Sequence, residues 1–123
     1  MTEALFEITK TATFDAAHSL QIGGAESPYR RLHGHSFRVE ASVRGPVSEA
    51  AGWVADFAEL DEALKAVAAA LDHQHLNQLP GLERPTLERL CAHFAEQLRP
   101  GFPGLSRVVV SRPSVGESCA LNL

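Results

Sequence analysis

Three histidines stand at the ends of two segments whose residue pattern is typical of β-strands. His33 and His35 lie in the motif Leu32–Ser36, and His18 closes the motif Phe14–His18. Side chains along a strand alternate between its two faces, so His33 and His35 share a face with the apolar residues at every second position after them. If the two strands are antiparallel neighbours, the end of the first lies beside the start of the second. All three imidazoles would then meet.

Three imidazoles leave one position free on a tetrahedral zinc ion, which is the arrangement of catalytic rather than structural zinc sites. We therefore predict a metal site formed by His18, His33 and His35, with Zn²⁺ as the expected ion. Nickel, copper and iron also bind imidazole, so the ligand set alone leaves the metal open. The alternative is that all three are ordinary polar or core histidines, which an isolated pair of alternating histidines would favour.

The elements that position these histidines follow from the hydrophobic pattern. Asp56, with Glu59 three residues later, is a capping-box pattern at the start of one helix, and Thr86 is a suitable N-cap for a second. Strands are expected at residues 5–17, 32–44, 105–111 and 118–123. The order ββααββ predicts an α+β fold, a four-stranded antiparallel sheet with two helices on one face. Such a sheet leaves its edge strands exposed, which favours a homo-oligomer.

Composition limits the class of protein. The chain has 123 residues, 45% of them hydrophobic, which suits a single domain spanning residues 1–123. A net charge of -4 provides no basic surface for nucleic acid. Neither a membrane-spanning apolar run nor a secretory signal is recognisable, and two cysteines are too few for a disulfide framework. We expect a cytoplasmic enzyme that acts on a small molecule.

Five motifs in this order resemble the 6-pyruvoyltetrahydropterin synthase and 6-carboxytetrahydropterin synthase family. They are Phe14–His18, Leu32–Ser36, Trp53–Leu60, Leu71–Asn77 and Pro85–Glu88. The resemblance implies the tunnelling fold (T-fold), in which trimers close their sheets into a barrel and often pair into hexamers, with active sites between subunits. It also implies a substrate, 7,8-dihydroneopterin triphosphate, and it assigns the three zinc ligands to His18, His33 and His35.

The resemblance further assigns the family's catalytic Asp-His pair to Asp72 and His73. A general base must take up a proton near the working pH, and a histidine oriented by a carboxylate can do so. The alternative for these two residues is a plain helix C-terminus, where a histidine interacts with the last carbonyls and the helix dipole.

Two residues depart from the family pattern. The family carries a catalytic cysteine four residues before the His-Gly-His motif, where this chain has Tyr29. The family's pterin-anchoring glutamate corresponds to a position near Arg112, and an arginine cannot accept hydrogen bonds. Glu117 is the candidate replacement anchor, and Cys119, two residues further on the same strand face, is the candidate relocated base. The alternative for Cys119 is an inert, partly buried thiol.

Arg30 and Arg31 are candidate contacts for the triphosphate, because guanidinium groups match phosphate oxygens. The alternative is a solvated pair on a mobile loop. Together these residues predict a zinc-dependent lyase of the 6-carboxytetrahydropterin synthase type, in the synthesis of queuosine and other 7-deazapurines. Two other functions stay open: 6-pyruvoyltetrahydropterin synthesis or dihydroneopterin side-chain cleavage, and a non-catalytic module that binds metal and a pterin or purine.

Overall fold

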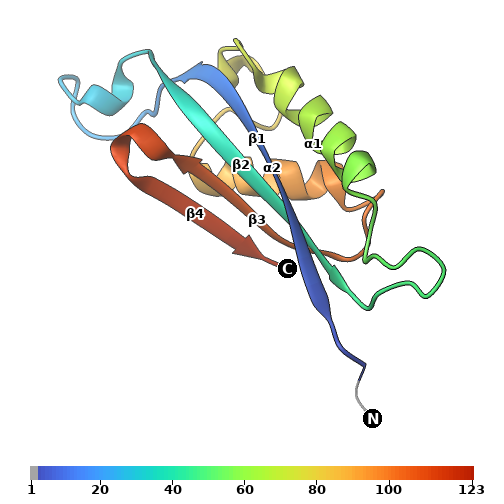
Figure 1. Ribbon diagram of the computed structural model, residues 1–123. Coiled ribbons are helices and arrows are strands. Elements are labelled where there is room, and N and C mark those ends of the chain that lie inside the picture. The colour runs from blue at the N-terminus through green and yellow to red at the C-terminus, as the bar shows by residue number, and fades with distance from the viewer. Residues whose placement is uncertain (1–2) are drawn as a thin grey trace.

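A four-stranded antiparallel sheet forms the base of the fold in the computed structural model, which describes residues 3–123. Its strands lie side by side in chain order. They are β1 (Phe6–His18), β2 (His33–Gly45), β3 (Leu105–Arg112) and β4 (Glu117–Asn122). Helices α1 (Phe57–Leu71) and α2 (Leu87–Leu98) lie between β2 and β3 in the chain and cover the same face of the sheet (Figure 1). The predicted α+β class and ββααββ order are confirmed.

Both helices begin at the predicted capping residues. The Asp56 carboxylate accepts a hydrogen bond from the Ala58 N–H at 2.8 Å, and the Thr86 hydroxyl accepts one from the Arg89 N–H at 3.2 Å. Each cap satisfies a backbone donor that has no partner within the helix. Because α1 ends at Leu71, Asp72 and His73 follow its last turn directly and lie near the end of β1.

The core lies between the sheet and the two helices. Phe14 of β1 stacks on Phe37 of β2 at a ring-centroid distance of 5.0 Å, and Phe94 of α2 packs against Phe14 at 5.8 Å. Lys10 interrupts the apolar face of β1, and the structure explains why it is tolerated. Its ammonium group lies 3.6 Å from the Asp61 carboxylate of α1, so the charge is paired at the edge of the core.

The register of β1 and β2 determines where the histidines lie. His18 is opposite His33, and Ala16 is opposite His35. Because the facing strands end together, the apolar rows that contain Phe14 and Phe37 both continue into histidine. The three histidines therefore lie close together, as predicted, because β1 and β2 pair in this register.

The four strands form one sheet, and both helices pack on it around one core. Residues 1 and 2 of the predicted domain lie outside the described part. Within residues 3–123, neither helix has the length and apolar character needed to cross a membrane. The free edge of β1 is partly covered, because Ala17 forms a bridge with His75. β4 is the other edge of the sheet, and the oligomeric barrel stays a prediction.

Candidate metal centre and active site

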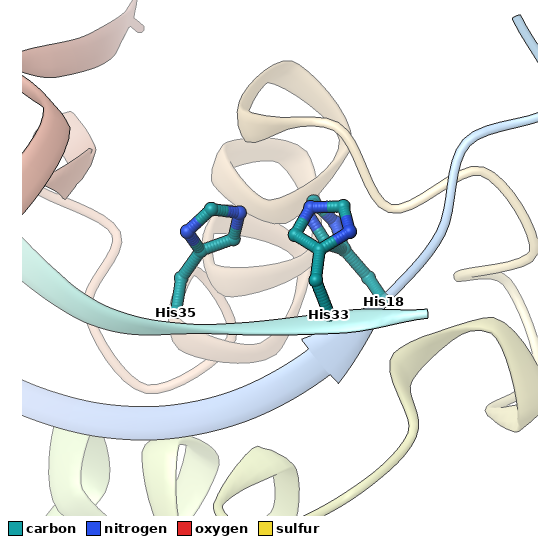
Figure 2. Close-up of side chains that lie close together, drawn as sticks. All are labelled: His18, His33 and His35. Atoms are coloured by element: carbon teal, nitrogen blue, oxygen red, sulfur yellow. The ribbon is translucent and has the colours of Figure 1, made fainter. Parts of the chain in front are cut away.

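The three histidines form a compact cluster at one end of the sheet. His33 and His35 extend from β2 and His18 from β1, and their rings face one another (Figure 2). The centroids are 4.7 Å apart for His18 and His33, 4.9 Å for His18 and His35, and 4.8 Å for His33 and His35. One ligand atom of each residue lies within 4.8 Å of the others. One metal ion placed between these nitrogens would contact all three.

Hydrogen bonds at the far side of two rings orient them for such an ion. His18 Nδ1 lies 3.1 Å from the Pro85 carbonyl oxygen, and His33 Nδ1 lies 2.6 Å from the Arg31 carbonyl oxygen. A carbonyl can only accept, so each Nδ1 carries the proton and each Nε2 keeps a free lone pair. Metal-binding histidines in proteins are commonly oriented in this way.

Unpartnered buried nitrogens also fit a metal ion. The Nε2 atoms of His18 and His35 are buried and have no hydrogen-bond partner among the described residues. A buried polar atom without a partner costs free energy, and a bound cation would remove that cost. The residues present therefore fit a divalent metal ion.

Burial favours the neutral form of His18 and of His35. Desolvation lowers the pKa of His18 from 6.5 to about 4, although the hydrogen bond to Pro85 acts in the opposite direction. The pKa of His35 is also lowered, mainly by burial and then by the positive charge of Arg112. Metal binding requires the deprotonated imidazole, so the cluster is ready to bind a cation at neutral pH.

Asp72 and His73 form a hydrogen-bonded dyad beside β1. The Asp72 carboxylate accepts from the Asp15 backbone N–H at 2.8 Å through Oδ1, and its Oδ2 lies 2.7 Å from His73 Nδ1. The His73 N–H donates to the Asp15 carbonyl at 2.6 Å, which ties the dyad to the strand. The pKa of His73 is raised above its ordinary value, first by the hydrogen bond to Asp72 and then by its charge.

The backbone of His73 has an unusual conformation. Its φ of 58° makes it the one non-glycine residue with positive φ among the described residues. Such a conformation is unfavourable for a residue with a side chain and persists where surrounding contacts enforce it, often at functional sites. Here the bonds to Asp15 and Asp72 hold it in place, and the imidazole remains 79% exposed. These contacts leave the His73 imidazole exposed rather than buried as a helix cap.

An open cavity of about 680 Å³ adjoins the dyad, and its lining includes Asp15, Gly34, His35, Ser36 and His73. The side chains of Asp15 and Ser36 hydrogen-bond to each other at 2.5 Å. By strand alternation they lie on the face opposite His18 and His35. The cavity nevertheless borders both His73 of the dyad and His35 of the triad.

Arg112 and Glu117 are a charged pair that acts on His35 of the triad. They are direct partners at the end of β3 and the start of β4, and Arg112 Nε lies 3.1 Å from Glu117 Oε1. The positive charge of Arg112 lowers the pKa of His35, and the negative charge of Glu117 acts on the same ring in the opposite direction. Glu117 therefore lies beside the metal site, as a ligand anchor requires.

Cys119 lies elsewhere within this chain. It is paired with Val110 of β3 and packs against the core, and its carbonyl accepts from the Cys91 thiol at 3.3 Å. It is two residues beyond Glu117, which itself pairs with Arg112 at the end of β3. The relocated-base role of Cys119 stays a prediction, and the geometry favours the alternative of a packed, inert thiol.

Substituting Cys119 by alanine tests that role. Because the thiol packs against the core, we expect turnover to stay within about twofold of the wild type, with at most ~1 kcal/mol lost in the free energy of unfolding. Steady-state rates and urea unfolding would measure both. A fall in kcat of about a hundredfold or more, with folding and metal content unchanged, would instead identify Cys119 as a base.

The two loop arginines differ in their contacts. Arg30 is fixed within its own loop, where Nε donates to the Gly23 carbonyl at 2.9 Å and Nη1 to the Gln21 side chain at 3.1 Å. Arg31 contributes its carbonyl to His33, and its side chain has no hydrogen bond or ion pair within residues 3–123. Tyr29, at the position of the family's cysteine, is 56% exposed.

Some contributors to the site carry no recognisable sequence signal. Pro85 and Arg31 orient the ligand histidines through backbone carbonyls, which any residue has. Asp15 supports the dyad through its backbone as well. The Arg112–Glu117 pair had a weak signal, since a charge near each end of a β-hairpin turn can form a cross-strand pair.

Comparison with known proteins defines the class. A sequence profile of the 6-pyruvoyl tetrahydropterin synthase family matches residues 7–122. The chain is 41% identical over 109 residues to a 6-carboxy-5,6,7,8-tetrahydropterin synthase from Synechocystis, covering 84% of this chain and 83% of that protein. It is 36% identical over 93 residues to a dihydroneopterin monophosphate aldolase from Pyrococcus furiosus, covering 76% and 75%.

The fold agrees with that class. The Caenorhabditis elegans 6-pyruvoyl tetrahydropterin synthase superposes with a TM-score of 0.86 at 21% identity, covering 100% of this chain and 99% of that one. The architecture is therefore the predicted T-fold. The chain belongs to the 6-pyruvoyl tetrahydropterin synthase family, a family of pterin-processing enzymes.

Proposed function

We propose that this protein is a zinc-dependent lyase of the 6-carboxytetrahydropterin synthase type, acting on 7,8-dihydroneopterin triphosphate in the synthesis of 7-deazapurines such as queuosine. The observation that carries the proposal is the triad of His18, His33 and His35, whose inward nitrogens are free for a metal ion. Three protein ligands leave a coordination position open for substrate. The similarity to the Synechocystis enzyme supports the reaction class.

The metal and the dyad would divide the chemistry. When bound to the triad, Zn²⁺ would act as a Lewis acid toward side-chain oxygens of the pterin, acidifying the adjacent C–H. His73 would take up the proton at Nε2, since Nδ1 is held by Asp72. Its exposed ring suits a group that must reach a bound ligand. Glu117, beside the triad, would accept hydrogen bonds from the amino group and ring N–H of the pterin.

We further propose that the complete site forms between subunits of a trimer or hexamer. Within one chain, the charge of Arg112 lowers the pKa of both His18 and His35, and Glu117 acts on His35, whereas neither Asp72 nor His73 contributes to either shift. The exposed His73 imidazole borders an open cavity and is available to a second copy of the chain. A cytoplasmic location stays a prediction.

A second candidate is cleavage of a dihydroneopterin side chain. The similarity to the Pyrococcus aldolase favours it. The packing of the partly buried Cys119 thiol against the core also favours it, because cleavage by a retro-aldol step requires one base to deprotonate a hydroxyl, and His73 can supply that base.

One incubation separates these functions. The metal-loaded protein would be supplied with dihydroneopterin triphosphate and, separately, the monophosphate, and the pterin products identified by mass spectrometry. We expect a 6-carboxy product from the triphosphate. A pyruvoyl product or a hydroxymethylpterin would identify the other two reactions. Tight binding with zinc present and no product would show a non-catalytic binding module.

Replacing Arg30 and Arg31 together by alanine tests the phosphate contacts. Loss of two charge-assisted hydrogen bonds should raise KM for the triphosphate substrate by roughly tenfold or more, with a smaller effect on unphosphorylated dihydroneopterin. The Arg31→Ala variant alone should show most of the effect, because Arg30 is already engaged by Gly23 and Gln21. An unchanged KM in the double variant would remove both residues from the substrate site.

A further inference from the structure

The Arg112–Glu117 pair combines a donor group and an acceptor group at one wall of the metal site. Arg112 ends β3 and Glu117 begins β4, and the turn between them, η3 (Pro113–Val115), closes through Gly116 at a φ of 68°. Since Arg38 is opposite Ser111, Arg112 comes next to Phe37, whose ring lies 5.7 Å from that of His35. Phe37 is two residues from His35 on the same face of β2, so the pair lies close to a candidate metal ligand.

The guanidinium group has unused hydrogen-bonding capacity. Its Nε lies 3.1 Å from Glu117 Oε1 but is poorly aligned for a hydrogen bond, so this buried donor is unpartnered within residues 3–123. The terminal nitrogens of Arg112 also make no hydrogen bond to the described residues. The Arg112 side chain is 16% exposed, whereas that of Glu117 is 51% exposed. Water can therefore hydrogen-bond to the Glu117 carboxylate more readily than to the Arg112 guanidinium group.

Charge decides what kind of ligand fits. The charges of Arg112 and Glu117 cancel, so a phosphate or carboxylate approaching Arg112 would also meet the Glu117 carboxylate. A neutral group with a carbonyl oxygen next to an N–H matches both members at once, because arginine only donates and an ionised glutamate only accepts. A cyclic amide, or lactam, has this pattern.

We propose that Arg112 and Glu117 together recognise the lactam edge of a heterocyclic ligand, with Arg112 donating to the ring carbonyl oxygen and Glu117 accepting from the neighbouring N–H. This inference rests on the proposed pterin-processing function and adds Arg112 to it as the residue that selects a 4-oxo ring. Removing the carbonyl would leave the buried guanidinium unpaired, which is costly.

Binding of two ring analogues to the metal-loaded protein tests the assignment without turnover. The ligands are pterin, which carries the 4-oxo lactam, and 2,4-diaminopteridine, which does not, at a pH at which both are neutral. We expect the wild type to bind pterin at least tenfold more tightly. Arg112→Met should reduce this preference by about tenfold, mainly by weakening pterin binding, whereas Glu117→Gln should weaken the binding of pterin because a neutral amide oxygen accepts from the ring N–H less strongly than a carboxylate.

Metal content and the unfolding midpoint of each variant show whether the triad and the fold are intact. If Arg112→Met is unstable, Arg112→Lys serves in its place. It keeps a donor and a charge and should therefore retain part of the preference for pterin over 2,4-diaminopteridine. Equal weakening of both ligands in Arg112→Met, or a wild type without preference, would overturn the assignment while leaving the proposed function in place. A wild type that binds neither pteridine would instead refute the proposed substrate class.

Discussion

Substituting His35 by alanine is expected to empty the metal site and to lower kcat/KM by roughly 10³-fold or more. The magnitude follows from the several kcal/mol that a Lewis-acid ion contributes to transition-state stabilisation, at about 1.4 kcal/mol for each tenfold in rate. Two imidazoles would remain, and His18 and His33 alone provide too few ligands for a stable tetrahedral site. Metal content by mass spectrometry and steady-state kinetics would measure the two effects together.

The matched control is His93→Ala. His93 lies on α2 beside Phe94, away from the histidine cluster. Burial lowers its pKa, as it does that of His35, so the two residues share chemistry and differ in position. The His93 variant should keep its metal and its activity. Full activity in a metal-free His35→Ala protein would show that the reaction does not depend on the triad.

The sequence predicted this cluster because strand alternation and pairing are regular. Once His18 and His33 terminate two adjacent strands with matching apolar faces, antiparallel pairing leaves little choice for their positions. Helix starts were predictable for the same reason, since Asp56 and Thr86 satisfy local backbone donors. Local rules and the global fold agree at these positions.

Other features depend on contacts between distant segments, and sequence spacing says little about them. The hydrogen bonds of Asp72 to Asp15 and of His73 to Asp15 join positions 57 and 58 residues apart, and they alone explain the left-handed backbone at His73. The packing of Cys119 is a related case. It shares a strand face with Glu117, but two residues further along the strand its side chain is partly buried and packs against the core. Spacing along the strand alone does not predict this burial.

Replacing His73 by glutamine should lower kcat by about 10² to 10⁴-fold while leaving the metal content unchanged, because an amide can hydrogen-bond but cannot take up the substrate proton. A base works in its neutral form, and Asp72 raises the pKa of His73. The rate should therefore rise with pH along a limb of the pH profile whose midpoint lies above the ordinary pKa of histidine. In Asp72→Asn the amide can still accept from the Asp15 N–H, but the carboxylate charge is lost, so this limb should move to lower pH as kcat falls. If the pH dependence of kcat is the same in Asp72→Asn as in the wild type, the titrating group is not His73.

Mixing two inactive variants tests whether the dyad serves the triad of a neighbouring subunit. His35→Ala subunits keep the dyad, and His73→Gln subunits keep the triad. If each site combines groups of two copies, equal mixing by co-expression should restore about a quarter of wild-type activity, because half of the intact triads would meet an intact dyad. If each site lies within one chain, every subunit lacks one essential group and mixing restores nothing. The exposed His73 ring favours the first result, because a second copy of the chain can reach it.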